Sequence, residues 1–267
     1  MSHVDPIRLG TMEISVVCEG FAPLDLADEC PGRDVDWSAE RTRHPWAFLS
    51  EDAWPWHVHG FVVRTGSVTV VVDTGLGSFP PYAPWVEQAA GEPWGGLDLE
   101  TVEHVVVTHL HADHAGGTVA PGGAARFPNA RYHVHPADWA HFEDADDTEA
   151  YVARGAMGRL ADEGRVSFLG EDHEIASGVR LIHTPGHTPG HRSVVMDDAV
   201  LLTGDLLHLP VQAANPSWPS SHDEDPKLGA RSRTAVLGRA GEAGHLIGVP
   251  HFARPFGRLA DGGWREA

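Results

Sequence analysis

The amino-acid sequence predicts an α+β protein that is rich in strands, with helices interspersed between them. Short runs of β-branched and alternating apolar residues are typical of strands, and the run at 105–108 is continuous enough to be a buried one. Segments with helical periodicity separate the runs in the second half of the chain. Side chains suited to metal binding follow the predicted strands, where a rigid sheet can present them.

The first part of the chain is predicted to form strands on either side of an irregular arm. Residues 12–18 alternate loosely and predict a strand. Residues at about 21–57 are rich in Pro, Trp and Asp without a period, so we expect an arm packed on the body, a pocket or a second subunit. Further strands are predicted at 61–64, 68–73, 105–108 and 131–135.

The second part alternates helices with strands. Residues 210–226 predict a long polar loop of the kind that often caps a site. The sequence shows no internal repeat or low-complexity linker, so we predict a single domain over residues 1–267. The predicted helices lie at 137–142, 149–163 and 227–243, and the predicted strands at 180–184, 193–196, 200–203 and 245–249.

The composition excludes several classes of partner. The chain carries 38 acidic residues against 19 lysines and arginines, a net charge of −19, whereas nucleic acid and anionic membranes require positive charge at the contact. The apolar runs are too short for a membrane span, and the first residues lack a signal-peptide pattern. Cys18 and Cys30 form no disulfide framework. We therefore expect a cytoplasmic protein with two free thiols that acts on a small molecule.

A histidine-rich motif follows the predicted buried strand at 105–108. Nineteen of the 267 residues are histidines, and four metal-capable side chains lie on one short turn, at His109, His111, Asp113 and His114. Imidazole and carboxylate ligands suit Zn, Mn, Fe or Co, and the absence of thiolate argues against iron–sulfur and copper sites. The motif therefore predicts a divalent metal site.

Further candidate ligands occur downstream, each just after a predicted strand. They are His187 in a Thr-Pro-Gly-His-Thr-Pro-Gly-His run, Asp205 in Thr-Gly-Asp, and His251 in Val-Pro-His. A single loop histidine has little meaning alone, but four strand-end sites in one chain favour a shared metal centre.

The ordered set Asp73, His109-x-His111-x-Asp113-His114, His187, Asp205 and His251 resembles the five signature motifs of the metallo-β-lactamase superfamily. The resemblance covers roughly residues 12–255 and implies an αββα sandwich with two metal ions per chain at one edge of its two sheets.

The resemblance also implies a role for each residue of this set. One metal would be held by His109, His111 and His187, and the second by Asp113, His114 and His251. Asp205 would bridge the two ions. Asp73 would orient ligands through hydrogen bonds. Outside the resemblance, His191 and His208 are further candidates for fixing the tautomer or angle of a ligand.

Departures from particular branches of the superfamily narrow the expected function. Zinc β-lactamases have a cysteine in place of Asp205, so a β-lactam substrate is not expected. The flavodiiron branch has a glutamate in place of His111, which disfavours redox chemistry. The closest resemblance is to the lactonase and methyl parathion hydrolase-like group. Acyl-homoserine lactonases have a tyrosine shortly after the bridging aspartate, whereas the nearest tyrosine here is Tyr151.

The resemblance implies a hydrolase in which a metal-bridging hydroxide attacks a lactone, ester or related acyl substrate. Asp113 and Asp205 are the expected catalytic carboxylates, because either could transfer a proton near the metal-bound oxygen. Zinc is the expected metal, with Mn, Fe and Co as alternatives. No Gly-x-Ser-x-Gly nucleophile motif is present.

The pocket beside the metals requires apolar walls, and the arm is rich in tryptophan. The candidate pocket residues are His57, His59, Trp54, Trp56, Trp218 and Phe252. Ordinary core packing is the alternative for each of them.

Three other functions remain open at this point. The same scaffold could hydrolyse phosphotriesters, or it could serve a non-hydrolytic biosynthetic cyclase, lyase or oxygenase. A binding protein without catalysis is disfavoured because no ligand of the motif is missing. A homodimer is also open, with the arm at its interface.

Overall fold

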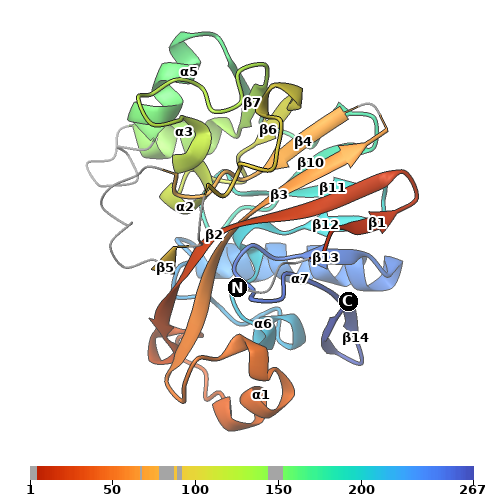
Figure 1. Ribbon diagram of the computed structural model, residues 1–267. Helices are drawn as coiled ribbons and strands as arrows, with labels where there is room; N and C mark the ends of the chain where they lie inside the picture. Colours follow the sequence, from red (N-terminus) through yellow and green to blue (C-terminus); the bar gives the residue numbers. More distant parts are fainter. Residues whose placement is uncertain (1–4, 67, 78–86, 89–91, 144–152) are drawn as a thin grey trace. The chain divides into compact units, whose positions relative to one another are not determined.

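The computed structural model describes residues 5–66, 68–77, 87–88, 92–143 and 153–267 (Figure 1). The chain forms two compact units, each built from two stretches of sequence. Unit 1 comprises Met1–Phe21 and Val58–Gly170, and unit 2 comprises Ala22–His57 and Glu171–Ala267. The four residues 149–152 of the helix predicted at 149–163 lie outside the described part of the chain.

The larger sheet has eight strands, in the order β1-β2-β3-β4-β6-β7-β8, with β5 paired to β2. Pairs β4/β6, β6/β7 and β7/β8 are parallel, whereas β3/β4 is an antiparallel hairpin. The strands are β1 (Ile7–Leu9), β2 (Met12–Asp25), β3 (Ala53–Thr65), β4 (Val68–Val72), β5 (Glu87–Gln88), β6 (His104–Val106), β7 (Arg131–Val134) and β8 (Val166–Phe168).

Parallel strands need crossover connections, and the helical elements of unit 1 lie in them. Valines supply the last three residues of β4 and the last two of β6, and all five are buried, as expected for parallel strands covered on both faces. The helical elements are η3 (Leu99–Thr101), α2 (Ala112–Ala115), η4 (Gly116–Thr118), α3 (Pro136–Glu143), the π-helical turn η5 (Ala153–Met157) and α5 (Gly158–Asp162).

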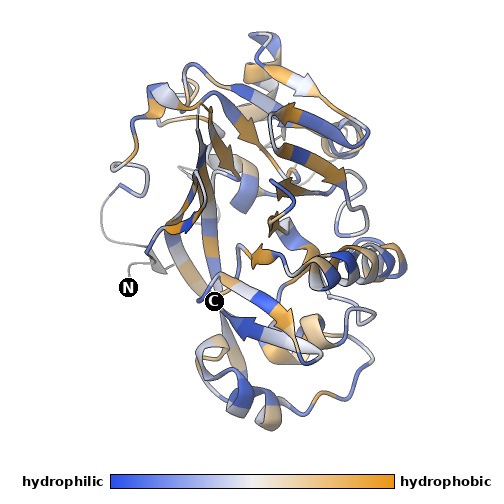
Figure 2. Cartoon of the chain, turned by 90° about the vertical axis from the view of Figure 1, so that its right-hand side faces the viewer, coloured by the Kyte–Doolittle hydropathy of each residue, from blue (hydrophilic) through white to orange (hydrophobic). Residues whose placement is uncertain are grey.

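Unit 2 contains a seven-stranded sheet in the order β15-β14-β13-β12-β11-β10-β9. Only the β12/β13 pair is parallel, and every residue of these two strands is buried. Figure 2 colours many residues of the strands orange, for hydrophobic. The strands are β9 (His173–Ala176), β10 (Val179–His183), β11 (Arg192–Met196), β12 (Val200–Leu202), β13 (Leu246–Gly248), β14 (Phe256–Ala260) and β15 (Gly263–Glu266).

Helix α7 (Pro226–Ala243) connects the two parallel strands of unit 2. Asp225 caps its first turn by accepting hydrogen bonds from the amides of Lys227 and Leu228, and Pro226 occupies the first helical position. Gly244 ends the helix in the left-handed conformation, at φ 68°. The buried side chains of α7 include Val236, Leu237 and Ala240, which join the hydrophobic cluster beside this sheet.

The predicted arm and polar loop contain regular structure. Strand β2 continues to Asp25 and β3 begins at Ala53, so strands occupy both ends of the arm. Between them lie η1 (Leu26–Asp28), α1 (Trp37–Arg43) and η2 (Pro45–Ala47). The loop predicted at 210–226 begins with α6 (Pro210–Ala214). Near its end, His222 Nε2 lies 3.1 Å from Glu29 Oε1, joining the loop to the arm.

The arm and the loop share one hydrophobic cluster, which we call the arm cluster. It explains why a tryptophan-rich segment without a regular period folds in water. Its fully buried members are Leu26, Cys30, Trp54, Leu209 and Val211. Half-buried side chains pack around them, namely Leu24, Val35, Trp37, Phe48, Trp56 and Trp218.

The helix predicted at 227–243 and most strands of the sequence prediction agree with the structure to within a few residues. The prediction omitted β1, β5, β8, β9, β14 and β15. The β14–β15 hairpin carries a recognisable signal: Asp261 and Gly262 both have positive φ and form a two-residue turn, the pattern typical of an Asp-Gly hairpin.

Cys30 has a free and buried thiol. Burial raises the pKa of this thiol to about 12, which makes it a poor nucleophile.

No helix in the described residues is both long enough and apolar enough to cross a membrane.

Trp54 is 2% exposed within the arm cluster, so Trp54→Ala should leave a large cavity. We expect it to lower the free energy of unfolding by about 3–5 kcal/mol. Urea unfolding of the metal-free protein, followed by circular dichroism, measures this change. Trp37→Ala removes a half-buried tryptophan of the same cluster and should cost clearly less. Equal midpoints for the Trp54 variant and the wild type would contradict the proposed packing of the arm.

Candidate metal-ligand clusters

The histidine-rich motif of unit 1 lies between β6 and α2. His109 Nε2 lies 2.9 Å from His111 Nδ1, and the rings of His109 and His114 are 4.1 Å apart between centroids. His114 Nε2 lies 3.0 Å from Asp113 Oδ2. His109 and His114 are each 1% exposed. The structure therefore gathers the four predicted ligands of this motif into one group, in which His109 and His114 are buried and His111 and Asp113 are partly exposed.

Asp73 lies behind His114 at the end of β4, in the left-handed region at φ 59°, which aspartate tolerates better than most residues. Its Oδ1 accepts a hydrogen bond from the Thr108 amide at 2.8 Å, and its Oδ2 accepts one from the Thr108 hydroxyl at 2.9 Å. His114 Nδ1 lies 2.8 Å from the same Oδ2. Because a carboxylate only accepts, His114 carries a proton on Nδ1, and its Nε2 faces Asp113.

A buried glutamate that the sequence analysis missed supports the loop after Asp73. The carboxylate of Glu19 accepts hydrogen bonds from the amides of Leu76 at 2.6 Å and Gly77 at 3.1 Å. Burial raises the pKa of Glu19, although these two hydrogen bonds act in the opposite direction. Gly75 has φ 75°, and a Cβ there would come within 2.3 Å of the Glu19 side chain, so the close approach requires glycine.

The cluster of unit 2 is centred on Asp205. Its Oδ2 lies 3.3 Å from His187 Nε2, 3.2 Å from His208 Nε2 and 3.1 Å from His251 Nε2. All four residues are buried. His187, Asp205 and His208 each offer one ligand atom, and these atoms lie within 4.8 Å of one another. Three imidazole nitrogens thus surround one carboxylate, and His208, predicted only to orient a ligand, is among them.

His191 holds the backbone of Asp205. Its Nε2 accepts a hydrogen bond from the Asp205 amide at 2.9 Å, so the ring proton is on Nδ1, which lies 3.0 Å from the carbonyl oxygen of Thr184. Both ring nitrogens are therefore engaged inside the protein, and His191 orients the backbone of Asp205.

The arm holds the ring of His251. Its Nδ1 lies 2.7 Å from the carbonyl oxygen of His57, so Nδ1 carries the proton and Nε2 faces Asp205. The half-buried ring of Trp56 packs on that of His251 with centroids 5.3 Å apart. Burial, together with the neighbouring His251, lowers the pKa of His57 to about 4. The hydrogen-bond contact of His57 with His251 is made by the backbone carbonyl of His57.

Asp223 and Arg233 form a buried ion pair at 3.0 Å that the sequence did not reveal. Asp223 Oδ1 also lies 3.7 Å from His187 Nδ1. Burial acts to raise the pKa of Asp223, but its contact with His187 and the charge of Arg233 outweigh burial and hold the pKa below its ordinary range.

The candidate pocket residues differ in how deeply they are buried and in which unit they lie. Trp54 and Phe252 are each 2% exposed and belong to hydrophobic clusters of unit 2, so both act as core side chains. Trp56 and Trp218 are half-buried, and Trp56 touches His251. His59 lies buried on β3 in the part of that strand that belongs to unit 1.

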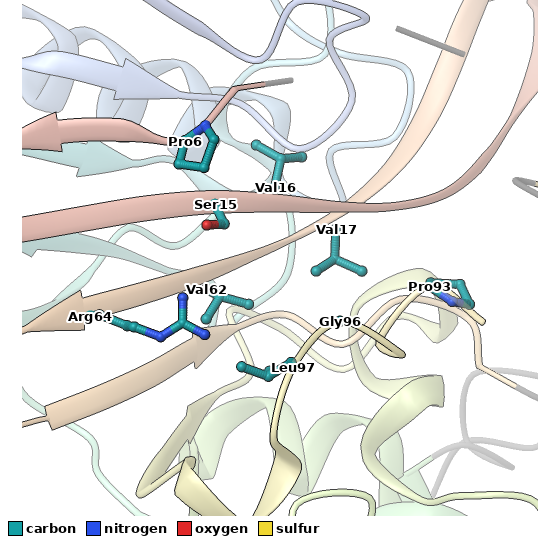
Figure 3. A pocket seen from close by; sticks show the side chains of 9 residues that line it. All are labelled: Pro6, Ser15, Val16, Val17, Val62, Arg64, Pro93, Gly96 and Leu97. Atoms are coloured by element: carbon teal, nitrogen blue, oxygen red, sulfur yellow. The ribbon is translucent and has the colours of Figure 1, made fainter. Parts of the chain in front are cut away.

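A separate hollow of about 270 Å³ lies on unit 1 (Figure 3). Apolar side chains from β2 and β3, among them Val17 and Val62, line it together with Leu97 and the partly exposed Arg64. None of the predicted metal ligands is among its lining residues.

The family model described as the metallo-beta-lactamase superfamily matches residues 53–249, well over half of the chain. An N-acyl homoserine lactonase from Bacillus sp. is 35% identical over 117 residues, which cover 42% of this chain and 42% of that protein. The lactamase-like protein notP from Aspergillus sp. (strain MF297-2) is 31% identical over 148 residues, covering 55% of this chain and 37% of that protein. The chain thus spans less than half the length of these two relatives.

Solved structures resemble the chain over almost its whole length. The hydrolase AbOPH of the β-lactamase superfamily superposes with a TM-score of 0.81 at 22% identity, covering 98% of this chain and 96% of that one. AidC, a dizinc quorum-quenching lactonase in complex with a product, gives a TM-score of 0.79 at 19% identity, with the same coverage. At these identities the likeness shows the fold, and it confirms the fold class predicted from the sequence.

Asp73→Asn should weaken unit 1 even without metal, because it turns one buried acceptor oxygen into a donor beside Thr108 and His114. We expect a loss of about 2–3 kcal/mol in unfolding free energy, measured by urea unfolding in the presence of EDTA. Asp98→Asn is a matched control, since exposed Asp98 only caps η3 and asparagine caps equally well. Equal losses in the two variants would rule out a special role for Asp73.

Proposed function

Since the chain belongs to the metallo-β-lactamase superfamily, we propose that it is a dinuclear metal-dependent hydrolase that opens lactones or cleaves related esters. The chain is a hydrolase of metallo-β-lactamase fold with clusters of histidine and aspartate suited to metal ions. Beyond that, we propose its substrate class, its full set of metal ligands and the number of its metal ions.

One observation carries the proposal, and it occurs independently in each unit. In each unit a buried histidine donates a hydrogen bond from Nδ1 to one oxygen, while its Nε2 lies close to the carboxylate of another residue. The distance from His114 Nε2 to Asp113 is 3.0 Å in unit 1, and that from His251 Nε2 to Asp205 is 3.1 Å in unit 2. With Nδ1 protonated, a neutral ring offers only a lone pair at Nε2, which a carboxylate oxygen about 3 Å away repels. A cation between them, either a proton or a metal ion, resolves the conflict.

The chemistry of the donor groups favours a metal ion as that cation. Unit 1 offers His109, His111, Asp113 and His114, and unit 2 offers His187, Asp205 and His251, all nitrogen or oxygen ligands suited to Zn, Mn, Fe or Co. We propose these seven residues as the metal ligands, with zinc as the leading candidate. Bound divalent ions would supply two functions, polarising the acyl oxygen and acidifying a water molecule.

The remaining chemistry belongs to the chain's own side chains. The Asp205 carboxylate lies 3.3, 3.2 and 3.1 Å from the Nε2 atoms of three imidazoles, so it would hold the same cation as these rings. Asp113 has a side chain that is 12% exposed, against 5% for Asp205, which favours Asp113 as the carboxylate that exchanges a proton with substrate or solvent. The half-buried ring of Trp56 beside His251 offers an apolar wall for an acyl group.

The curated relatives support a lactone as substrate, because several of them are N-acyl homoserine lactonases. Three residues after Asp205 this chain has His208, and no tyrosine follows Asp205 in its sequence. The proposal therefore covers lactones and esters as a class. Phosphotriester hydrolysis and non-hydrolytic chemistry on the same scaffold remain outcomes that the experiment can reveal.

The test is a substrate panel run on protein loaded separately with Zn, Mn, Fe and Co. Elemental analysis should give about two metal ions per chain for the best metal. Proton release at constant pH should show turnover of lactones or aryl esters that stops on chelation and returns when metal is added. A preference for phosphotriesters would replace the lactone assignment. Failure to bind metal after loading, or turnover that is indifferent to chelation, would overturn the proposal.

Asp205→Ala should be more damaging than replacement of any single histidine ligand, because this carboxylate contacts three imidazoles. We expect kcat/KM to fall by more than about 100-fold, equivalent to more than about 2.7 kcal/mol, together with reduced metal content. His187→Ala and His251→Ala are the comparisons, each removing one of the three imidazoles. Wild-type metal content and turnover in the Asp205 variant would show that Asp205 is not a central metal ligand.

A further inference from the structure

We infer that Asp223, held in place by Arg233, is the positioning residue for His187. It fixes the imidazole so that Nδ1 keeps its proton and Nε2 is the nitrogen available to a metal ion. This inference rests on the proposed function, in which His187 is a metal ligand. It adds two buried residues, neither of which belongs to the superfamily motifs of the sequence.

The two oxygens of Asp223 have different neighbours. Oδ2 accepts hydrogen bonds from Arg233 Nη2 at 3.0 Å and from the Ser220 amide at 3.1 Å. Oδ1 lies 3.7 Å from His187 Nδ1, within ion-pair distance but longer than a hydrogen bond. The side chain is fully buried. One oxygen thus anchors the carboxylate, and the other presents negative charge to the imidazole.

Arg233 connects this carboxylate to the segment that carries Asp205. The arginine side chain is 1% exposed on the buried face of α7. Its Nε donates to the carbonyl oxygen of Leu206, directly after Asp205, and its Nη1 donates to that of Trp218 at 2.6 Å. A buried charge is tolerated only when it is paired and hydrogen-bonded. The guanidinium therefore fixes the loop of Asp223 relative to the loop of Asp205.

The backbone holds His187 from the same side. The Glu224 amide donates to the carbonyl oxygen of His187 at 3.2 Å, and the Asp225 amide donates to that of Gly186 at 2.9 Å. A Cβ at Gly186 would come within 2.0 Å of the Gly229 nitrogen, so the start of α7 and the His187 loop are in contact. Residues 223–229 consequently constrain both the ring and the main chain of His187.

The consequence for His187 follows from charge. A carboxylate facing Nδ1 favours the tautomer with the proton on Nδ1 and makes Nε2 a better donor, as carboxylate partners do for ligating histidines in general. His187 Nε2 already lies 3.3 Å from Asp205 Oδ2. Asp223 and Asp205 thus face opposite nitrogens of the same ring.

The first arm of the test uses metal-free wild-type protein at pH 8. Two-bond proton–nitrogen spectra of histidine-labelled protein, with the His187 signals assigned by His187→Gln, report which ring nitrogen carries the proton. We expect Nδ1–H in the wild type. An unprotonated Nδ1 would overturn the inference, whereas a second proton on Nε2, which faces Asp205 Oδ2 at 3.3 Å, would not. This readout needs neither metal nor turnover, so it stands even if the proposed hydrolase activity fails.

The second arm compares Asp223→Asn with Asp36→Asn, a control in which the N-cap aspartate of α1 becomes an equally good cap. Zinc affinity, measured by competition with a chelator, should fall by about 10–100-fold in the Asp223 variant, and the His187 tautomer should shift. The control should keep both wild-type values. Lower thermal stability of Asp223→Asn with unchanged zinc affinity and tautomer would reduce Asp223 to a structural ion-pair partner.

If Asp223→Asn does not fold, Gly229→Ala serves instead. It leaves the charge in place, but its Cβ would lie 2.9 Å from Asp223 Oδ2 and should displace the carboxylate. We then expect weaker zinc binding. Because alanine favours a helix more than glycine does, this loss would not come from a less stable α7. Unchanged zinc binding would count against the inference.

Discussion

The contact of the Asp205 carboxylate with three imidazole nitrogens is the constraint on which unit 2 depends. Each histidine reaches it from a different strand end: His187 after β10, His208 after β12 and His251 after β13. Buried polar atoms this close are stable only if each is compensated. For His251 the compensation comes from the far side of the ring, where Nδ1 lies 2.7 Å from the His57 carbonyl oxygen on β3.

Unit 1 solves the same problem with different residues. Asp73 accepts a hydrogen bond from Nδ1 of His114, and the amide and hydroxyl of Thr108 donate two more hydrogen bonds to Asp73. The loop after Asp73 is in turn held by the carboxylate of Glu19, which reaches the amides of Leu76 and Gly77. In both units the orientation of a histidine that we propose as a ligand is thus set by a second oxygen, which comes from a strand or loop distant in sequence.

This arrangement explains how much of the site could be predicted from the sequence. The motif from His109 to His114 is local, so its spacing reveals it, and the β-branched runs around it predict the strands that carry it. Asp223, Arg233 and Glu19 show no such signal. Each is one charged residue among many, and its importance arises only when long-range folding buries it. The sequence also did not reveal that β2 and β3 extend into the arm. Residues of these extensions pack into the arm cluster and do not alternate regularly between apolar and polar, so the strand pattern is missing.

The sequence of the arm is constrained because the same short segment packs the arm cluster and contacts His251. Within five residues of β3, Trp54 fills the arm cluster, Trp56 covers the ring of His251, and the His57 carbonyl fixes that ring's tautomer. Because successive residues of a strand point to opposite faces, a shift of β3 by one residue would turn Trp54 and Trp56 together away from the arm cluster and from His251. Changes in specificity are therefore compatible with the fold when they alter the half-buried Trp56 side chain alone, whereas insertions between Trp54 and His57 would move the oxygen that holds His251.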